Sequence, residues 1–151
     1  MAIPAFRVFF DTSVYIAGLL SPTGAAAELI RLAETGAVAM VVSEEVIVES
    51  DEVLGAKFPD LVEGSRRLWK SLDPEIAPSP NRRQLAPFCR MLPAAGAAIL
   101  CAAAGTEVSA FVTWNTRDFM KKGVDTLVPF PIVIPKDCLK LFREWIEPYL
   151  D

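Results

Sequence analysis

Short apolar runs alternate along the chain with longer segments in which apolar residues recur every three or four positions. The runs predict buried strands at residues 6–10, 38–42, 109–113 and 128–134. The periodic segments predict helices, which lie at about 26–35, 44–54, 60–72, 81–91, 94–104 and 135–150. Strands that alternate with helices favour a parallel sheet covered on both faces. The pattern therefore predicts an α/β fold with three α/β/α layers and a mainly parallel central sheet.

Capping and breaking residues mark the ends of some of these segments. Gly36 is placed to end the first helix in a left-handed conformation. Ser43 is placed as the N-cap of the helix that follows the second strand. Pro87 lies inside the predicted helix at 81–91 and weakens that prediction, because proline removes a backbone hydrogen bond.

The composition is that of a packed globular protein. The chain has 151 residues, of which 52% are hydrophobic and 23% charged, and this predicts a single domain over residues 1–151. The longest apolar stretch, residues 92–105, is too short to cross a bilayer. The N-terminus lacks the charged start, long apolar middle and cleavage site of a signal peptide. We therefore expect a cytoplasmic protein.

The absence of histidine limits the chemistry that the chain can perform. It excludes Ser-His-Asp and Cys-His catalysis and histidine metal ligands. Cys89, Cys101 and Cys138 are far apart and form no C-x-x-C pair, so we expect three buried thiols rather than a disulfide framework or a zinc site. Hydrolytic chemistry would have to use carboxylates, hydroxyls, lysines or a metal held by oxygens.

Acidic residues follow the strands at the points where ligands bind in parallel sheets. Asp11 directly follows the first strand, Glu49 lies on the helix after the second, and Asp118 lies just beyond the third. If these carboxylates converge, they form an oxygen-only site of the kind that suits Mg²⁺ or Mn²⁺. Taken singly, each acid fits an ordinary role equally well, as a helix cap, a solvated helix residue or a loop acid.

Four segments together resemble the PIN-domain family, and most closely the VapC-like toxins of toxin–antitoxin systems. The segments are Phe9-Phe10-Asp11-Thr12-Ser13-Val14-Tyr15-Ile16, Leu19-Leu20-Ser21-Pro22-Thr23-Gly24, Val41-Val42-Ser43-Glu44-Glu45 with Glu49, and Val112-Thr113-Trp114-Asn115-Thr116-Arg117-Asp118-Phe119. The resemblance covers nearly the whole chain in order. It implies an endoribonuclease that cleaves single-stranded RNA with Mg²⁺ or Mn²⁺.

The resemblance also implies roles for particular residues. Asp11, Glu49 and Asp118 would hold the metal, which would activate a water and polarise the scissile phosphate. Ser13, Thr113 and Asn115 would orient waters or phosphate oxygens. The family further implies an antitoxin protein as partner and a homodimer, for which the apolar residues of the last helix offer a surface. Those residues are Leu139, Leu141, Phe142, Trp145 and Ile146.

Two positions depart from the family pattern. Relatives usually have an aspartate at the start of the helix before the third strand, where this chain has Gly96 within Gly96-Ala97-Ala98-Ile99-Leu100. No acid occurs from Ile76 to Thr106, so a shift of register supplies no substitute. The position of Asn115 is also an acid in much of the family. An impaired nuclease, or an inactive PIN domain that binds RNA or an antitoxin-like protein, are therefore both open.

Other patterns give weaker alternatives. Asp11 after a strand is also typical of aspartyl-phosphate enzymes, but their second acid is replaced here by Ser13. The net charge of −4 requires that any nucleic acid meets a local basic patch. Two small clusters, Arg66-Arg67 with Lys70 and Arg82-Arg83 with Arg90, are better explained as solvated helix faces. Trp114 lies within the site loop, whereas Trp69 and Trp145 are typical of core or interface aromatics.

Overall fold

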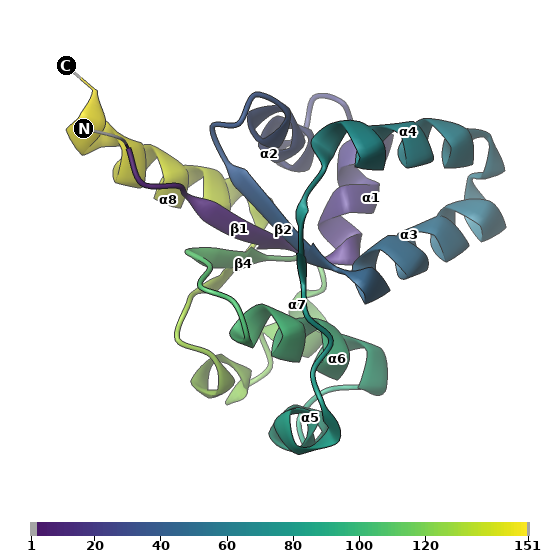
Figure 1. Ribbon diagram of the computed structural model, residues 1–151, viewed down its shortest axis with the longest axis vertical. Helices are drawn as coiled ribbons and strands as arrows, with labels where there is room; N and C mark the ends of the chain where they lie inside the picture. The colour runs from purple at the N-terminus through teal and green to yellow at the C-terminus, as the bar shows by residue number, and fades with distance from the viewer. Residues whose placement is uncertain (1–2, 151) are drawn as a thin grey trace.

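The structure is a computed structural model that describes residues 3–150, and this part of the chain forms a sheet of five parallel strands in the order β3-β2-β1-β4-β5 (Figure 1). The strands are β1 (Arg7–Phe10), β2 (Ala39–Ser43), β3 (Glu75–Ala77), β4 (Ala110–Val112) and β5 (Ile132–Val133). The predicted α/β class with a parallel central sheet is confirmed. Residues 1, 2 and 151 of the predicted domain lie outside the described residues.

Helices cover both faces of the sheet and complete the three predicted layers (Figure 1). The α-helices are α1 (Thr12–Leu20), α2 (Ala25–Glu34), α3 (Glu44–Lys57), α4 (Val62–Leu72), α5 (Arg82–Cys89), α6 (Ala94–Ala104), α7 (Thr116–Phe119) and α8 (Pro135–Ile146). Three short 3-10 helices are η1 (Pro59–Leu61), η2 (Val124–Leu127) and η3 (Glu147–Tyr149). Helices α1 to α4 connect β1, β2 and β3 on one face, and α5 and α6 carry the chain across the other face to β4. Within residues 3–150, no single helix is long and apolar enough to span a membrane.

The strand order changes direction between β1 and β4. From β1 the chain moves outward to β2 and β3, whereas from β4 it moves the other way to β5. The two strands pair in register, with Phe9 opposite Phe111 and Phe10 opposite Val112. The N–H of Asp11 continues this ladder with a 3.0 Å hydrogen bond to the carbonyl of Val112. Asp11 and Thr113 therefore leave the sheet side by side, at the kind of switch point where parallel sheets bind ligands.

Apolar strands and a helix of small residues form the core around this point. Val8, Phe9 and Phe10 are fully buried, as expected for a strand covered on both faces. Helix α6 consists largely of alanine, and its small side chains, such as the buried Ala97, let its backbone approach the sheet closely. Burial of such apolar surface is the main stabilising contribution to the fold.

The structure differs from the sequence prediction at the edges of the sheet. The sequence analysis did not predict β3, because Ile76 at its centre is 48% exposed and the strand lacks a buried run. The predicted strand at residues 128–134 shrinks to β5, since Pro129 and Pro131 cannot donate to a ladder. Ser43 occupies the N-cap of α3 as predicted, but its side chain makes no capping hydrogen bond.

Two further details of the prediction are corrected. Cys101 and Cys138 are buried and free as expected, whereas Cys89 is free but exposed at the end of α5. The last helix ends at Ile146 rather than near residue 150, and η3 follows it, with Pro148 inside η3. The predicted end of the first helix is confirmed, since Gly36 adopts a left-handed φ of 82° just after α2, whereas α3 extends to Lys57 and α5 ends at Cys89.

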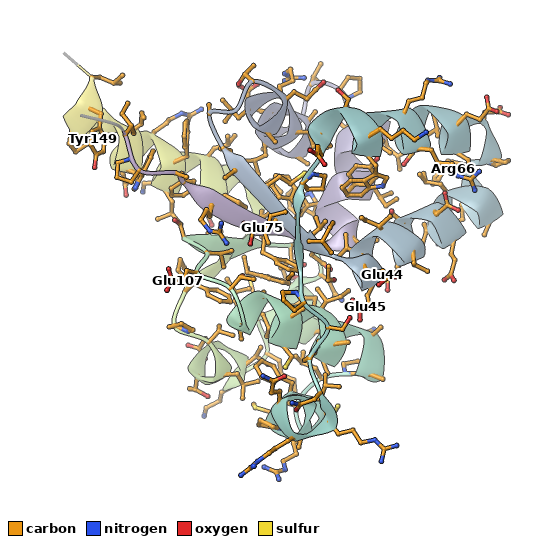
Figure 2. The ribbon with its side chains drawn as sticks, viewed as in Figure 1. Glu44, Glu45, Arg66, Glu75, Glu107 and Tyr149 are labelled. Carbon is orange, nitrogen blue, oxygen red and sulfur yellow. The ribbon has the colours of Figure 1, made fainter. Side chains whose placement is uncertain are left out.

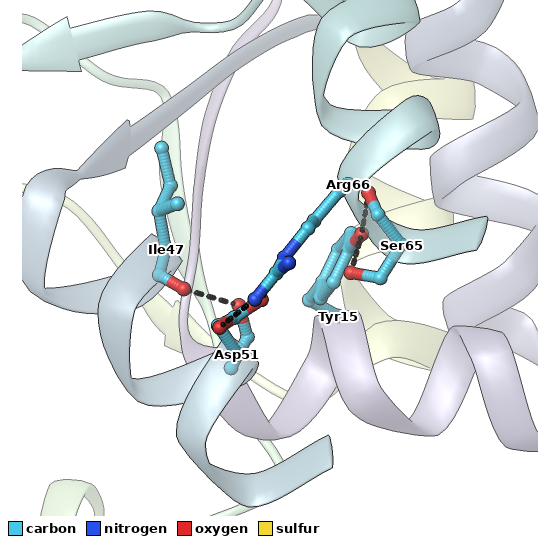
Figure 3. Close-up of polar contacts among 6 residues, drawn as sticks. Tyr15, Ile47, Asp51, Ser65 and Arg66 are labelled. Carbon is cyan, nitrogen blue, oxygen red and sulfur yellow. Dashed lines mark hydrogen bonds and ion pairs between the residues drawn. The ribbon is translucent and has the colours of Figure 1, made fainter. Parts of the chain in front are cut away.

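Helices α3 and α4 form a hairpin that is tied to α1. The Tyr15 hydroxyl shares a 2.8 Å hydrogen bond with the Ser65 hydroxyl (Figure 3). The Tyr15 ring also stacks on Trp69, with centroids 3.9 Å apart. Arg66 donates two 2.9 Å hydrogen bonds to the Asp51 carboxylate on the neighbouring helix (Figure 3). Because both members of this ion pair are largely exposed, it adds little stability and serves mainly to neutralise Arg66.

Candidate functional site

A cavity of about 530 Å³ opens at the carboxyl edge of the sheet, bounded by α1, α3, α6 and the segment from β4 to α7. Five of the six residues predicted for the site line it: Asp11, Ser13, Glu49, Asn115 and Asp118. The sixth, Thr113, is fully buried behind the cavity wall. The three segments that carry these residues are far apart in sequence, and the topology brings them to one edge.

Asp11 is the centre of a hydrogen-bond network between α1 and the β4–α7 segment. Only 4% of the surface of Asp11 is exposed to solvent. Its Oδ2 accepts hydrogen bonds of 2.7 Å from both the Ser13 and the Thr113 hydroxyls. Asp11 occupies the N-cap of α1, but its side chain accepts no capping hydrogen bond from the helix. Its carboxylate is therefore held by the two hydroxyls rather than used to cap a helix.

Both hydroxyls are in turn held by the backbone. The Trp114 N–H donates to the Ser13 Oγ at 2.9 Å, and the Asn115 N–H donates to the Thr113 Oγ1 at 2.9 Å. Each hydroxyl thus accepts one hydrogen bond from the backbone and donates one hydrogen bond to the Asp11 carboxylate. Since the Ser13 Oγ and the Thr113 Oγ1 lie 3.3 Å apart and both protons are in use, the network is arranged around an ionised Asp11.

Burial and hydrogen bonding act in opposite directions on this carboxyl group. Burial raises the pKa of Asp11 above its ordinary value, and the hydrogen bonds from Thr113 and Ser13 offset only part of that rise. The anion is therefore less stable here than in water. A cation beside Asp11 would remove this penalty, and such a site favours one.

Asn115 positions the second acid of the cavity. Asn115 caps α7, where its Oδ1 accepts the N–H of Asp118 at 3.3 Å. Its Nδ2 donates to the Asp118 Oδ2 at 3.0 Å, and the Asp118 side chain is 23% exposed. The amide thus fixes Asp118 at the cavity wall and supplies a donor at a position where an acid would repel that carboxylate.

Glu49 reaches the same cavity from α3. Because Glu49 and Val53 lie four residues apart, they share one face of the helix, and both line the cavity. Next to this wall, four glutamates and Ala95 line a further hollow. The glutamates are Glu44, Glu45, Glu49 and Glu52, and Figure 2 shows the first two at the start of α3. This side of the site is strongly acidic.

The three acids do not form a compact cluster. In residues 3–150, no group of three aspartate, glutamate or cysteine side chains is arranged to hold a metal ion. The position of the expected fourth acid explains part of this. Gly96 is the third residue of α6 and lines the cavity, so an acid there would add a carboxylate to the same space.

Sequence reasoning missed the apolar part of the cavity. Its walls include the side chains of Ile16, Leu20, Val53, Pro93, Ile99, Trp114 and Phe119. Helical periodicity could have found the contribution of α1, since residues 16 and 20 are one turn apart, but it cannot separate a core face from a cavity face. The Thr12 hydroxyl also lies at this wall and is buried without a hydrogen-bond partner among residues 3–150.

The comparisons with known proteins agree with this arrangement. A family model described as PIN domain matches residues 7–117, which extend from the start of β1 into α7. Asp118 lies one residue beyond the match. A search of curated proteins finds no match to the chain. PIN domains are in general a nuclease fold, and the matched region contains four of the five predicted site residues that line the cavity. The chain belongs to the PIN-domain family.

Proposed function

We propose that the protein is an endoribonuclease that cleaves single-stranded RNA with Mg²⁺ or Mn²⁺, acting as the toxin of a toxin–antitoxin system. The observation that supports this most is Asp11, a buried carboxylate held by two hydroxyls at the switch point of a nuclease fold. Glu49 and Asp118 line the same cavity from two other elements. Burial of Asp11 disfavours its ionised form in spite of these hydrogen bonds, and this unfavourable contribution is better explained by a functional site than by stability of the fold.

The donors of the cavity fit one divalent cation that keeps most of its waters. They are carboxylate, hydroxyl and amide oxygens, which are the ligands of Mg²⁺ and Mn²⁺. The raised pKa of Asp11 marks a carboxylate that gains from a nearby cation. Since no three acids are grouped for direct coordination in residues 3–150, we assign Asp11 as the direct ligand and Glu49 and Asp118 as ligands of bound waters.

When bound, the cation would supply an activated water and stabilise charge on the scissile phosphate. The other residues have separate tasks. Ser13 and Thr113 keep Asp11 ionised and oriented, because each donates to its Oδ2. Asn115 orients Asp118 toward the phosphate side of the cavity through its 3.0 Å hydrogen bond. With one carboxylate fewer than its relatives, we expect weak metal binding and slow cleavage.

The toxin assignment brings further proposals. An antitoxin protein would hold the enzyme in check in the cytoplasm, and the enzyme would act as a homodimer. The face of α8 that would contribute to a dimer is half-buried at Leu141, Phe142, Trp145 and Ile146, whereas Leu139 is buried in the core. Phe142 and Trp145 pack on Phe6, and Tyr149 beyond them is 39% exposed. Light scattering at high micromolar concentration would test the dimer, and a monomer there would contradict it.

A second function is supported by one specific observation. Gly96 removes the acid from the helix that borders the cavity, and the remaining acids are not grouped. A PIN domain without catalysis that binds RNA or an antitoxin-like protein accounts for this equally simply. A phosphotransfer enzyme is less well supported, because the Ser13 hydroxyl donates to Asp11 where such an enzyme needs an acid.

One experiment separates these functions. Mg²⁺ and Mn²⁺ are titrated into the wild type, Asp11→Asn and Glu107→Gln by calorimetry, and each protein is assayed with single-stranded RNA. Glu107 is an exposed acid far from the site, so its variant controls for the loss of one charge (Figure 2). The nuclease proposal requires metal binding and cleavage that Asp11→Asn abolishes and Glu107→Gln retains. Equal behaviour of all three would leave the non-catalytic alternative.

A further inference from the structure

Trp114 differs from the other two tryptophans in having an uncovered ring. Trp69 stacks on Tyr15, and Trp145 packs against Phe6. Among residues 3–150, Trp114 pairs with no aromatic side chain, and it is 46% exposed while lining the cavity. A tryptophan ring exposed at the mouth of a largely apolar cavity leaves a large apolar surface in contact with water, and this indicates that a ligand covers the ring.

The backbone of Trp114 is anchored close to the catalytic carboxylate. The Trp114 N–H donates to the Ser13 Oγ at 2.9 Å, and that hydroxyl donates to Asp11 at 2.7 Å. The indole therefore belongs to a segment anchored two hydrogen bonds from the Asp11 carboxylate. Leu20, which is 44% exposed, and Ile16 line the same cavity from α1. Asn115 and Asp118 add hydrogen-bonding groups to the apolar walls. A flat, partly polar group matches such a lining.

The charges next to the cavity indicate what this group is attached to. Phe119 lines the cavity and also a second hollow, which contains Lys121 and Lys122 together with Asp125. Both lysines are exposed and make no ion pair with another residue between 3 and 150. Arg117, 93% exposed, lies on the same segment, with its Nε 3.7 Å from the Asp118 Oδ1. The apolar cavity is thus bordered by a cationic surface, which suits a flat ring carried on a phosphate chain.

We propose that the cavity holds one unpaired nucleobase of the RNA, stacked on Trp114, with the adjoining phosphates on the hollow of Lys121 and Lys122. This inference rests on the proposed function, since it names how that site recognises RNA. Stacking of a base on an aromatic side chain tolerates different sequences and contributes to the affinity of single strands. Trp114 then sets which nucleotide can present its phosphate to the acids.

The test measures binding without metal, so that it does not depend on cleavage. A fluorescein-labelled single-stranded RNA and an abasic ribose-phosphate chain of the same length are compared by anisotropy in EDTA. The proteins are the wild type, Trp114→Ala, Trp114→Phe and the control Ile76→Ala, in which an equally exposed apolar residue at the sheet edge is removed. Leu replaces Ala at position 114 if thermal melting shows that the alanine variant is unfolded.

We expect the wild type to bind the RNA about tenfold more tightly than the abasic chain, which corresponds to about 1.4 kcal/mol. Trp114→Ala should lose this preference and bind the abasic chain as the wild type does, whereas Trp114→Phe and Ile76→Ala should retain it. A wild type without preference, an equal loss on both chains, or no loss in Trp114→Ala would each overturn the base subsite. If the preference holds but Mn²⁺ gives no cleavage, the nuclease proposal fails and the subsite stands.

Discussion

The Thr113 hydroxyl donates a 2.7 Å hydrogen bond to the Asp11 carboxylate across 102 residues of sequence. The contact exists because β1 and β4 pair in register up to Phe10 and Val112, so that the next residue of each strand emerges at the same edge. The position of the proposed site is thus a direct result of the strand order. It also makes the charge state of Asp11 depend on a residue of the opposite half of the chain.

This relationship predicts how stability depends on pH in the absence of metal. Because the pKa of Asp11 is raised by folding, the folded protein holds this proton more tightly than the unfolded chain does. The contribution of Asp11 to stability is therefore present below its ordinary pKa of 3.8 and is lost as the pH rises through the folded value. Asp11→Asn should consequently be more stable than the wild type at neutral pH in EDTA.

Urea unfolding between pH 4 and 8 measures this difference. The gap between Asp11→Asn and the wild type should widen as the pH rises and then level off. Thr113→Val removes a hydrogen bond that lowers the pKa of Asp11. The pH at which the stability difference levels off should therefore be higher when both proteins carry Thr113→Val. Saturating Mn²⁺ should close the gap, because only the wild type gains from the cation. A gap that narrows with rising pH would contradict the assigned direction.

Asn115 offers a second test of the acids at the cavity. In the wild type the Asn115 amide donates to the Asp118 carboxylate at 3.0 Å. Asn115→Asp replaces this donor by a second carboxylate, so that two negative charges face each other. We expect a loss of about 1 kcal/mol of unfolding free energy in EDTA. Mn²⁺ should recover more stability in this variant than in the wild type. The control is Asn81→Asp, which adds the same charge at the N-cap of α5 and should be nearly neutral.

Tyr15 allows stability to be changed without touching the site. Its hydroxyl bonds to Ser65 at 2.8 Å, and burial raises its pKa to about 12 (Figure 3). Tyr15→Phe leaves the buried Ser65 hydroxyl without this partner and should cost about 1 kcal/mol. Denaturant unfolding should show this loss, while metal titration and RNA cleavage remain unchanged. Tyr149→Phe, which alters an exposed tyrosine, should change stability by less than about 0.5 kcal/mol (Figure 2).

The parts of the structure that the sequence predicted are those in which local pattern and burial agree. β1 and β2 are short apolar runs because the sheet is covered on both faces, and Asp11 follows from the end of such a run. β3 could not be predicted, because its residues show no strand-like pattern of apolar positions and it is a strand only through its pairing with β2. Arg7 of β1 donates to the Glu75 carboxylate of β3, two strands away, and this contact depends on the strand order.

The site was predicted unevenly for a similar reason. Asp11 and Asp118 follow strands, and the rule that ligands bind at strand ends identifies them. The mutual arrangement of these acids with Glu49 depends on how α3 and α7 pack, and the sequence pattern does not contain that information. The sequence predicted that the three acids converge closely enough to hold one cation, whereas in residues 3–150 they line one cavity without being grouped in that way. It did not predict that Trp114 and Leu20 would give this cavity an apolar wall.

Gly96 provides the decisive test of the proposed nuclease site. It is the third residue of α6, and a Cβ built there would contact the Phe119 ring at 3.4 Å, which is an ordinary van der Waals distance. The Cβ of an aspartate therefore fits without moving its neighbours. In the first turn of a helix it also interacts favourably with the helix dipole, and it removes a flexible glycine, so we expect a gain of about 0.5–1 kcal/mol. Gly96→Asp should fold at least as well as the wild type in EDTA.

The added carboxylate would enter the cavity that Asp11, Glu49 and Asp118 already line. With Mn²⁺, Gly96→Asp should bind the ion more tightly and cleave single-stranded RNA faster than the wild type, because the acid supplies both a ligand and a full charge. Gly96→Asn is the matched control, since it has the same size without the charge and should gain neither property. Calorimetry and cleavage are measured on both variants and on Gly96→Asp combined with Asp11→Asn. If Gly96→Asp leaves metal affinity and cleavage at the wild-type level, and Asp11→Asn changes neither, the chain is a non-catalytic PIN domain.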